Sequence, residues 1–174
     1  MGIKRKQHKD KMDAADYFQR ANDKLEQGDF EGAIEDYTKA IEINPDLDYY
    51  YCSRGKLKEK LQIYQEAIDD YTKAIELDAN WKWYYIMRGD VFIKLQLYQK
   101  AIDNYNVYLE FGDTVDYQYR AKTNKFRFDT IGYERLCLAY YKIKEYDKAM
   151  EYINKAIELD PDNIVVQELK EKII

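Results

Sequence analysis

One stretch of the chain, AIEDYTKAIEINP at residues 33–45, is repeated along the sequence. It returns as AIDDYTKAIELDA at residues 67–79, starts again as AIDNY at residues 101–105, and returns as AMEYINKAIELDP at residues 149–161. The alanines that begin the first three copies are 34 residues apart, and the step to the fourth is 48 residues. Such a period is typical of stacked helical repeats, so we expect an extended array rather than one central core.

The composition is typical of a helix-rich, water-soluble chain. Charged residues make up 35% and aromatic residues 16%, with 19 tyrosines but only 7 glycines and 2 prolines. The net charge of −5 gives no general attraction to nucleic acid or to an anionic membrane. No apolar run is long enough to span a bilayer, and the basic start has no apolar segment behind it. The cytoplasm is therefore the expected location.

Each repeat is expected to fold as a pair of helices. In the first repeat, the two helices should span residues 14 to about 27 and residues 30–43. Gly28 can adopt the left-handed backbone that ends a helix, and Pro45 cannot continue the second helix. We expect four such repeats, at about residues 14–46, 47–80, 81–114 and 130–163, followed by a capping helix at residues 164–174.

Several positions hold the same kind of residue in every repeat. The alanines that begin each copy are small where two helices approach closely. A second position, where the helices of one repeat meet, is also always small. Aromatic residues recur three and sixteen residues before the alanine. These positions hold, in that order, Ala33, Ala67, Ala101 and Ala149; Ala21, Gly55, Gly89 and Cys137; Phe30, Tyr64, Tyr98 and Tyr146; and Tyr17, Tyr51, Tyr85 and Tyr133.

Together with the 34-residue period, the Gly-Asp-Phe turn at residues 28–30 and the Asn-Pro and Asp-Pro endings, this pattern resembles the tetratricopeptide repeat family over residues 14–163. The resemblance implies an all-α fold, a right-handed superhelical solenoid of antiparallel helix pairs. It also implies the usual role of the family, a non-catalytic scaffold whose concave groove holds a peptide or a partner helix. The third repeat departs from the pattern, because Tyr108 replaces its second small alanine.

The groove positions of the family, transferred to this chain, predict a mixed surface on the first helix of each repeat. Its aromatic side chains would supply contact area to a partner, and its charged side chains would fix the partner's orientation. The alternative for several of these residues, Cys52 among them, is simple packing between neighbouring repeats. The predicted groove residues are Phe18, Asn22, Tyr49, Cys52, Lys56, Trp83, Ile86, Asp90, Glu134, Leu138 and Tyr141.

Some members of the family grip the acidic carboxy-terminal tail of chaperones with Lys, Asn and Arg side chains on this face. Here the corresponding positions hold Phe18, Asn22, Ser53, Trp83 and Met87, and only the asparagine fits that carboxylate clamp. The sequence therefore argues against a chaperone tail as the partner. An extended or helical peptide with apolar anchors suits these residues better.

A comparison of the repeats also predicts a recurring internal ion pair. Arginines 20, 54 and 88 occupy one position, and Asp36, Asp70 and Asn104 occupy another. In the fourth repeat both change together, to Leu136 and Tyr152. Because a partly buried arginine needs an acceptor, we expect each arginine to bond the acidic residue or the asparagine of its own repeat. An anion-binding site is the alternative role for these arginines.

Two segments lie outside the repeat pattern. Residues 1–13 form a basic tail that we expect to be disordered, and residues 116–129 are an insertion before the fourth repeat. We expect the insertion to start the next helix early, near Tyr117; a surface loop or a short extra helix is the alternative. The insertion carries a basic–aromatic patch that either binds nucleic acid or an acidic peptide, or is a solvated face. This patch comprises Arg120, Lys122, Lys125, Phe126 and Arg127.

The sequence offers little for catalysis. The single histidine, His8, lies in the basic tail, and no phosphate-binding glycine loop, Cys-x-x-Cys pair or nucleophile motif is present. Cys52 and Cys137 belong to non-adjacent repeats, so we expect no disulfide. We expect no catalytic residue, no metal site and no cofactor. Besides a groove-binding scaffold, the alternatives are a self-assembling homo-oligomeric module, and binding of nucleic acid or an acidic partner through the tail and insertion, which the acidic balance disfavours.

Overall fold

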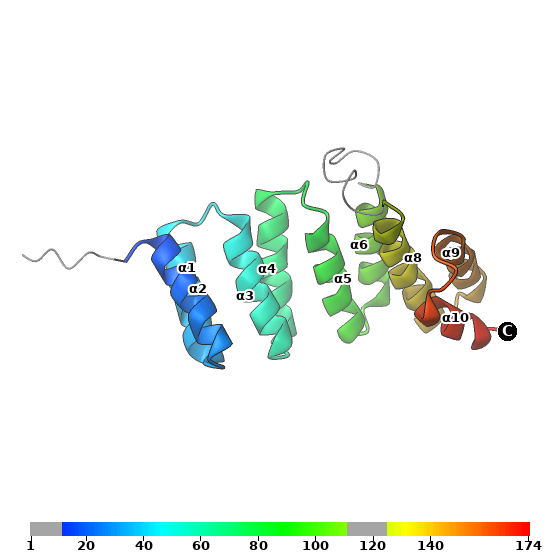
Figure 1. The fold of residues 1–174 in the computed structure, drawn as a ribbon, viewed down its shortest axis with the longest axis horizontal. Coiled ribbons are helices and arrows are strands. Elements are labelled where there is room, and N and C mark those ends of the chain that lie inside the picture. The colour runs from blue at the N-terminus through cyan, green and yellow to red at the C-terminus, as the bar shows by residue number, and fades with distance from the viewer. Residues whose placement is uncertain (1–11, 111–124) are drawn as a thin grey trace, which may run out of the picture.

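The computed structural model describes residues 12–110 and 125–174, and the side chains of residues 12–110 and 129–174. Nine α-helices and no β-strand occur in these two ranges (Figure 1). The expected early start near Tyr117 and residues 1–11 of the basic tail lie outside them. The helices are α1 (Ala14–Glu26), α2 (Phe30–Ile43), α3 (Asp48–Lys60), α4 (Tyr64–Leu77), α5 (Trp83–Lys94), α6 (Tyr98–Glu110), α8 (Lys125–Lys142), α9 (Tyr146–Leu159) and α10 (Ile164–Glu171).

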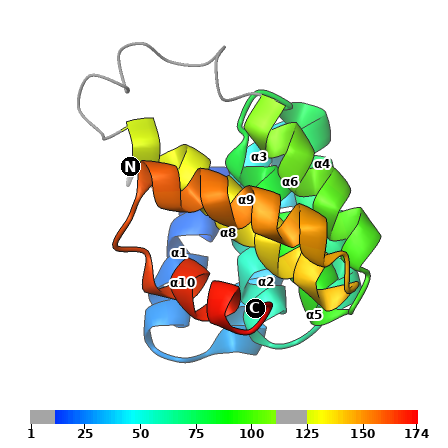
Figure 2. The same cartoon turned by 90° about the vertical axis from the view of Figure 1, so that its right-hand side faces the viewer.

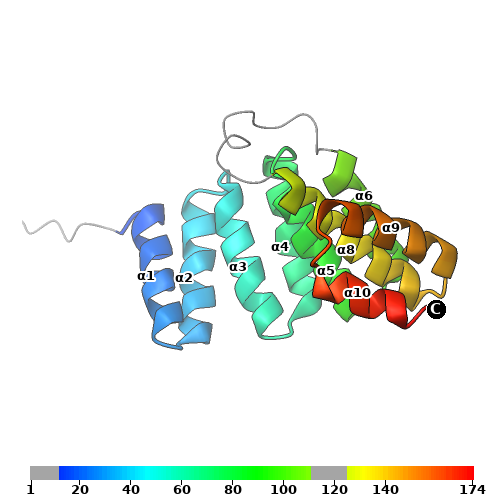
Figure 3. The same cartoon turned by 45° about the vertical axis from the view of Figure 1, so that its right-hand side comes forward.

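The helices pack as successive pairs in chain order. Helices α1 and α2, α3 and α4, α5 and α6, and α8 and α9 form four pairs, and each pair also contacts the next one. The pairs follow one another along the long axis of the molecule (Figures 1 and 3). This arrangement confirms the predicted all-α solenoid.

The last helix covers the end of the fourth pair. Helix α10 packs against α9 and α8, and Figure 2 shows it beside them at the C-terminal end. Val166 and Leu169 are buried in a small cluster with Cys137, Ile153 and Ala156. The side chain of Asn163 accepts a hydrogen bond from the backbone N–H of Val166 and caps the start of the helix.

The turn inside each pair adopts a left-handed backbone at one residue. In the first pair this residue is Gly28, with φ of 82°. The equivalent residues of the other three pairs are not glycine: Gln62 has φ of 63°, Gln96 has 59° and Lys144 has 65°. A side chain makes this conformation costly, so three of the four turns are held in place by the packing of the helices around them.

We therefore predict that Gln62→Gly stabilises the protein. Glycine adopts the left-handed region without a steric penalty, and this gain of about 1 kcal/mol exceeds the entropy that glycine adds to the unfolded chain. Urea unfolding followed by circular dichroism should show a higher midpoint than in the wild type. An unchanged or lower midpoint would mean that the Gln62 side chain itself stabilises the turn.

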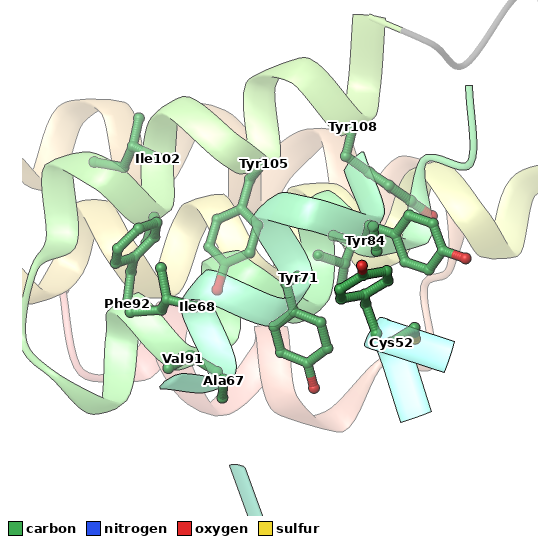
Figure 4. Packing of buried hydrophobic residues seen from close by; sticks show 14 of the residues in the cluster. Cys52, Ala67, Ile68, Tyr71, Tyr84, Val91, Phe92, Ile102, Tyr105 and Tyr108 are labelled. Atoms are coloured by element: carbon green, nitrogen blue, oxygen red, sulfur yellow. The ribbon is translucent and has the colours of Figure 1, made fainter. Parts of the chain in front are cut away.

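Glycine at the crossing of two helices creates room for a tyrosine ring. A methyl group added at Gly89 would lie 2.4 Å from Cε1 of Tyr105, and one added at Gly55 would lie 3.1 Å from Cε1 of Tyr71. Both rings are fully buried in the main core, which Figure 4 shows together with their neighbours. The second helix of each of these pairs therefore lays its ring directly against the backbone of the first helix.

The junction between the third and fourth pairs is built differently from the two before it. At the earlier junctions, Tyr50 and Tyr84 in the first turn of one pair follow a small alanine in the pair before it. At the third junction the preceding helix carries Tyr108, and the following helix carries Gly132. A methyl group added at Gly132 would lie 2.5 Å from Leu109 Cδ2 and 3.1 Å from Tyr108 Cδ1. At the third junction the large side chain therefore belongs to the preceding helix, whereas at the two earlier junctions it belongs to the following helix.

This exchange predicts a strong coupling between the two positions. Gly132→Ala should destabilise the protein by about 1–3 kcal/mol, because the extra methyl group overpacks the junction. The double variant Tyr108→Ala/Gly132→Tyr recreates the earlier junctions, so it should be more stable than the sum of its single changes implies. A double-mutant cycle in urea measures this coupling, and additive effects would show that the two positions do not share the space.

Candidate functional site

The predicted groove residues lie on the first helix of every pair, which is α1, α3, α5 or α8. At the N-terminal end of this row they form an aromatic surface. The Phe18 ring lies 5.2 Å from the ring of Tyr49, edge to face, and 5.4 Å from the ring of Tyr37. Tyr49 remains 43% exposed. A half-exposed aromatic side chain that is fixed by neighbouring rings is the kind of contact that a partner can bury.

Two of the predicted groove residues are part of the core instead. Cys52 and Ile86 are each only 5% exposed, and the Cys52 thiol donates to Met87 Sδ at 3.7 Å. Burial raises the pKa of the Cys52 thiol. These residues support the groove from below and offer little surface to a partner, which matches the alternative interpretation of Cys52. Trp83 is half-buried, with its ring 5.6 Å from that of Tyr108.

Tyrosine hydroxyl groups reach the groove from the second helices. Tyr37 donates to Asn22 Oδ1 at 2.6 Å, and Tyr105 donates to Asp90 Oδ1 at 2.8 Å. Tyr71 donates to Glu59 Oε2 at 2.6 Å. Burial raises the pKa of all three phenols, so each of them remains a donor at neutral pH. The polar groups of the groove are therefore oriented by side chains that cross the core.

Ion pairs link neighbouring repeats along the middle of the groove. Lys94 Nζ lies 2.7 Å from Glu59 Oε1, between α5 and α3. Arg135 on α8 lies 2.9 Å from both Asp90 Oδ1 and Glu134 Oε1. Burial raises the pKa of Asp90, although Arg135 opposes this shift. The carboxylates of the second half of the groove thus already have cationic partners within the chain.

The last two predicted groove residues lie at the C-terminal end of the row. Leu138 and Tyr141 are half-buried and pack against the cluster beneath α10. The Tyr141 ring also lies 5.9 Å from the ring of Tyr146. This end of the groove is therefore apolar and is partly covered by the chain itself.

The predicted pairing of arginine with the acidic residue of its own repeat is confirmed. Arg20 donates through Nε and Nη2 to the two oxygens of Asp36 at 2.6 Å each, and Arg54 bonds Asp70 in the same way. Arg88 donates to Asn104 Oδ1 at 2.9 Å. The first two contacts are bidentate and the third is a single hydrogen bond, and all three bridge the two helices of a pair, so they serve the fold rather than a bound anion.

A third position varies together with this pairing. In the first two pairs a lysine also reaches the buried carboxylate: Lys24 lies 2.9 Å from Asp36, and Lys58 lies 2.9 Å from Asp70. In the third pair, where asparagine replaces the aspartate, this lysine becomes Phe92. In the fourth pair the position is Tyr140, which stacks on Tyr152 with ring centres 5.5 Å apart. The lysine is therefore present only in the two pairs in which an aspartate occupies the buried position.

The arginines also connect one pair to the next. Arg54 Nη1 donates to Thr38 Oγ1 in the preceding pair at 3.0 Å, and Arg88 Nη1 donates to Thr72 Oγ1 at 3.0 Å. The same bond therefore recurs at the first two junctions.

The environment of Asp36 predicts how stability depends on pH. The hydrogen bonds from Arg20 lower the pKa of this fully buried carboxylate from 3.8 to about 2. Because the folded-state pKa is lower than the unfolded one, the stabilisation is complete above pH 4 and is lost as the pH falls towards 2, on the order of 1–2 kcal/mol.

Asp36→Asn tests this prediction, because Asn104 shows that an asparagine can accept from the arginine at the same position. Urea midpoints measured between pH 5 and pH 2 should fall less steeply for the variant than for the wild type. Equal slopes would mean that Asp36 does not contribute to acid unfolding.

The secondary basic–aromatic patch cannot be placed in the same way. Arg120 and Lys122 lie outside the described residues, and the side chains of Lys125, Phe126 and Arg127, in the first turn of α8, lie outside them as well. Within the described residues no group of three or more His, Cys, Asp or Glu side chains could hold a metal ion. No helix described here has the length and apolar character needed to cross a bilayer.

Sequence analysis missed several residues that shape the groove. Neither Lys60, at the end of α3, nor Arg135, directly after the predicted Glu134, is among the predicted groove residues. The tyrosines that bond Asn22, Glu59 and Asp90 share a column four residues after the repeated alanine, which is a detectable signal. In the fourth pair this column holds Ile153.

Family models match three parts of the chain. A "TPR repeat" model matches residues 21–62, and "Tetratricopeptide repeat" models match residues 49–80 and 131–163. Together these matches cover more than half of the sequence, and they fall on the helix pairs described above. The chain is a helical repeat protein that belongs to the tetratricopeptide repeat family.

Solved structures with similar folds agree with this assignment. The crystal structure of MamA is 24% identical, covers 88% of this chain and 81% of its own, and has a TM-score of 0.74. The OM64 TPR domain of Arabidopsis is 20% identical over 72% of this chain and 93% of its own, with a TM-score of 0.60. The second TPR of Spaghetti (RPAP3), bound to the HSP90 peptide SRMEEVD, is 28% identical over 57% of this chain and 93% of its own, with a TM-score of 0.53. Comparison with curated protein sequences gives no significant match.

Proposed function

We propose that this chain is a non-catalytic protein-interaction scaffold that binds a peptide or a partner helix along the groove of α1, α3, α5 and α8. Family membership supports this role, and so does the similar Spaghetti domain, which was solved with a bound peptide. The observation that carries the proposal is the aromatic surface of Phe18 and Tyr49, whose rings are in contact while Tyr49 remains 43% exposed. The cytoplasmic location and the lack of a cofactor stay predictions.

The peptide of this proposal differs from a chaperone tail. The positions of the carboxylate clamp hold Phe18, Ser53, Trp83 and Met87, of which none carries a positive charge. Phe18 and Trp83 are packed against other rings, so they favour an apolar anchor on the ligand.

Self-assembly is a second candidate function. The start of α10 exposes Ile164 to 69% and Val165 to 54%, and Ile174 beyond it is 90% exposed. Exposed aliphatic residues grouped at one end of a solenoid suit a second copy of the chain. Light scattering at two protein concentrations distinguishes this candidate, because a dimer would raise the mass at the higher concentration.

Tyr49→Ala tests the groove. The variant should bind captured partners at least about tenfold more weakly, since buried aromatic anchors commonly contribute that much to affinity. Tyr98→Ala, at the first residue of α6 and outside the groove, is the matched control and should bind like the wild type. Pull-down from lysate with quantitative mass spectrometry measures the amount of partner that each variant captures. Circular dichroism checks that each variant is folded. Equal capture by the two variants would move the binding site away from α1 and α3.

A further inference from the structure

A recess lies at the N-terminal end of the groove, where the first and second pairs meet. Its volume is about 350 Å³, and it is bounded by α1, α2 and α3. Four polar side chains that can donate hydrogen bonds line it, namely Asn22, Ser53, Lys56 and Lys60. Leu25 and Leu57 form an apolar part of its wall. The recess is therefore a small concave site with donors converging from two helices.

The two lysines of the recess differ from the other lysines near the groove. Lys24, Lys58 and Lys94 each lie within 2.9 Å of a carboxylate oxygen of this chain. Neither Lys56 nor Lys60 forms an ion pair with any residue that the structure describes. Lys60 Nζ lies 4.4 Å from the centre of the Phe30 ring, a contact that leaves its positive charge without a carboxylate partner among the described residues.

The amide of Asn22 is oriented by the core. Tyr37 donates its hydroxyl hydrogen to Asn22 Oδ1 at 2.6 Å, so the amide oxygen is already used. The amide NH₂ group then remains as the donor that this side chain can offer to a ligand. A fixed amide donor in a recess that two lysines also line favours an oxygen anion over a neutral or cationic group.

We propose that the recess binds the carboxylate side chain of an Asp or Glu residue in an acidic peptide that lies in the groove. This inference rests on the proposed function, because it assigns one side chain of the groove's ligand. The ring of Tyr37 lines the recess and packs 5.4 Å from Phe18, so the recess adjoins the aromatic surface. The ligand is thus an extended segment with an acidic residue next to an apolar or aromatic one.

The charges along the groove set the position of that acidic residue. Asp90 on α5 and Glu134 on α8 lie in the second half of the groove, both beside Arg135, whereas Glu59, on α3 next to the recess, is paired with Lys94. An acidic ligand residue placed over α5 or α8 would meet Asp90 or Glu134, whereas Lys56 and Lys60 lie at the first junction. The acidic residue of the ligand therefore belongs over α1 and α3.

The test is a random library of dodecamer peptides displayed on phage and selected on the wild-type protein. Enriched peptides are then synthesised with amidated C-termini, and their dissociation constants are measured by fluorescence anisotropy. The selected peptides should share an Asp or Glu at one fixed position. Lys56→Gln/Lys60→Gln should weaken their binding about tenfold, and the loss should shrink as NaCl screens the charges.

The control variant Lys142→Gln/Lys172→Gln removes the same charge at the other end of the array. Lys142 is the last residue of α8, as Lys60 is the last residue of α3. The control should bind the peptides as the wild type does. Circular dichroism and urea midpoints check that both double variants remain folded, since Lys60→Gln also removes the contact with the Phe30 ring.

The outcomes separate the two proposals. Peptides that lose affinity in Tyr49→Ala, but carry no fixed acidic residue or bind Lys56→Gln/Lys60→Gln normally, would overturn the recess and leave the groove in place. Peptides that bind only with a free C-terminal carboxyl group would overturn the assignment to a side chain. Binding that neither Tyr49→Ala nor the lysine variant weakens would overturn the groove as well.

Discussion

The structure depends on how closely the two helices of each pair approach. Gly55 and Gly89 have no side chain, so the rings of Tyr71 and Tyr105 lie directly against the backbone of the first helix of their pair. The hydroxyl groups of these tyrosines donate hydrogen bonds to Glu59 and Asp90 in the groove. One packing requirement therefore both closes the core and orients the polar surface. In such a protein a core substitution can change binding without any contact to the ligand.

The buried aspartates show how the same position is stabilised in different ways. A carboxylate removed from water must be paired, and Asp36 receives both an arginine and a lysine. Where the acid becomes Asn104, it accepts from one arginine, and where it becomes Tyr152, the ring stacks on Tyr140 and Lys155 lies 4.8 Å from its centre. Acid, asparagine and tyrosine are thus each stabilised at this position by a different set of neighbours, so the repeats differ in sequence and still share one backbone.

Much of the fold could be predicted because the repeats supply an internal comparison. The period placed α1 and α2, and the paired changes at Arg20 and Asp36 and their equivalents revealed a contact across a pair. The candidate site was less predictable. Burial of Cys52 and Ile86 depends on how far neighbouring pairs close on each other, and Arg135 reaches Asp90 across a junction whose spacing the insertion alters. The 34-residue period does not predict the exchange of Tyr108 and Gly132 either. The two residues occupy different positions of the repeat, and they come into contact at only one junction.

That exchange has a consequence for how the chain finds its native order. Near-identical repeats can pair out of step, so that one unit docks where its neighbour belongs, and the first two junctions repeat the same arginine–threonine bond. At the third junction, a helix that carries Tyr108 fits only against one that presents Gly132, because a second bulky residue there would collide with it. At the two earlier junctions the equivalent position holds Tyr50 or Tyr84, so docking Tyr108 there would bring two bulky side chains together. This steric constraint favours the native order of the repeats over alignments that are shifted by one repeat.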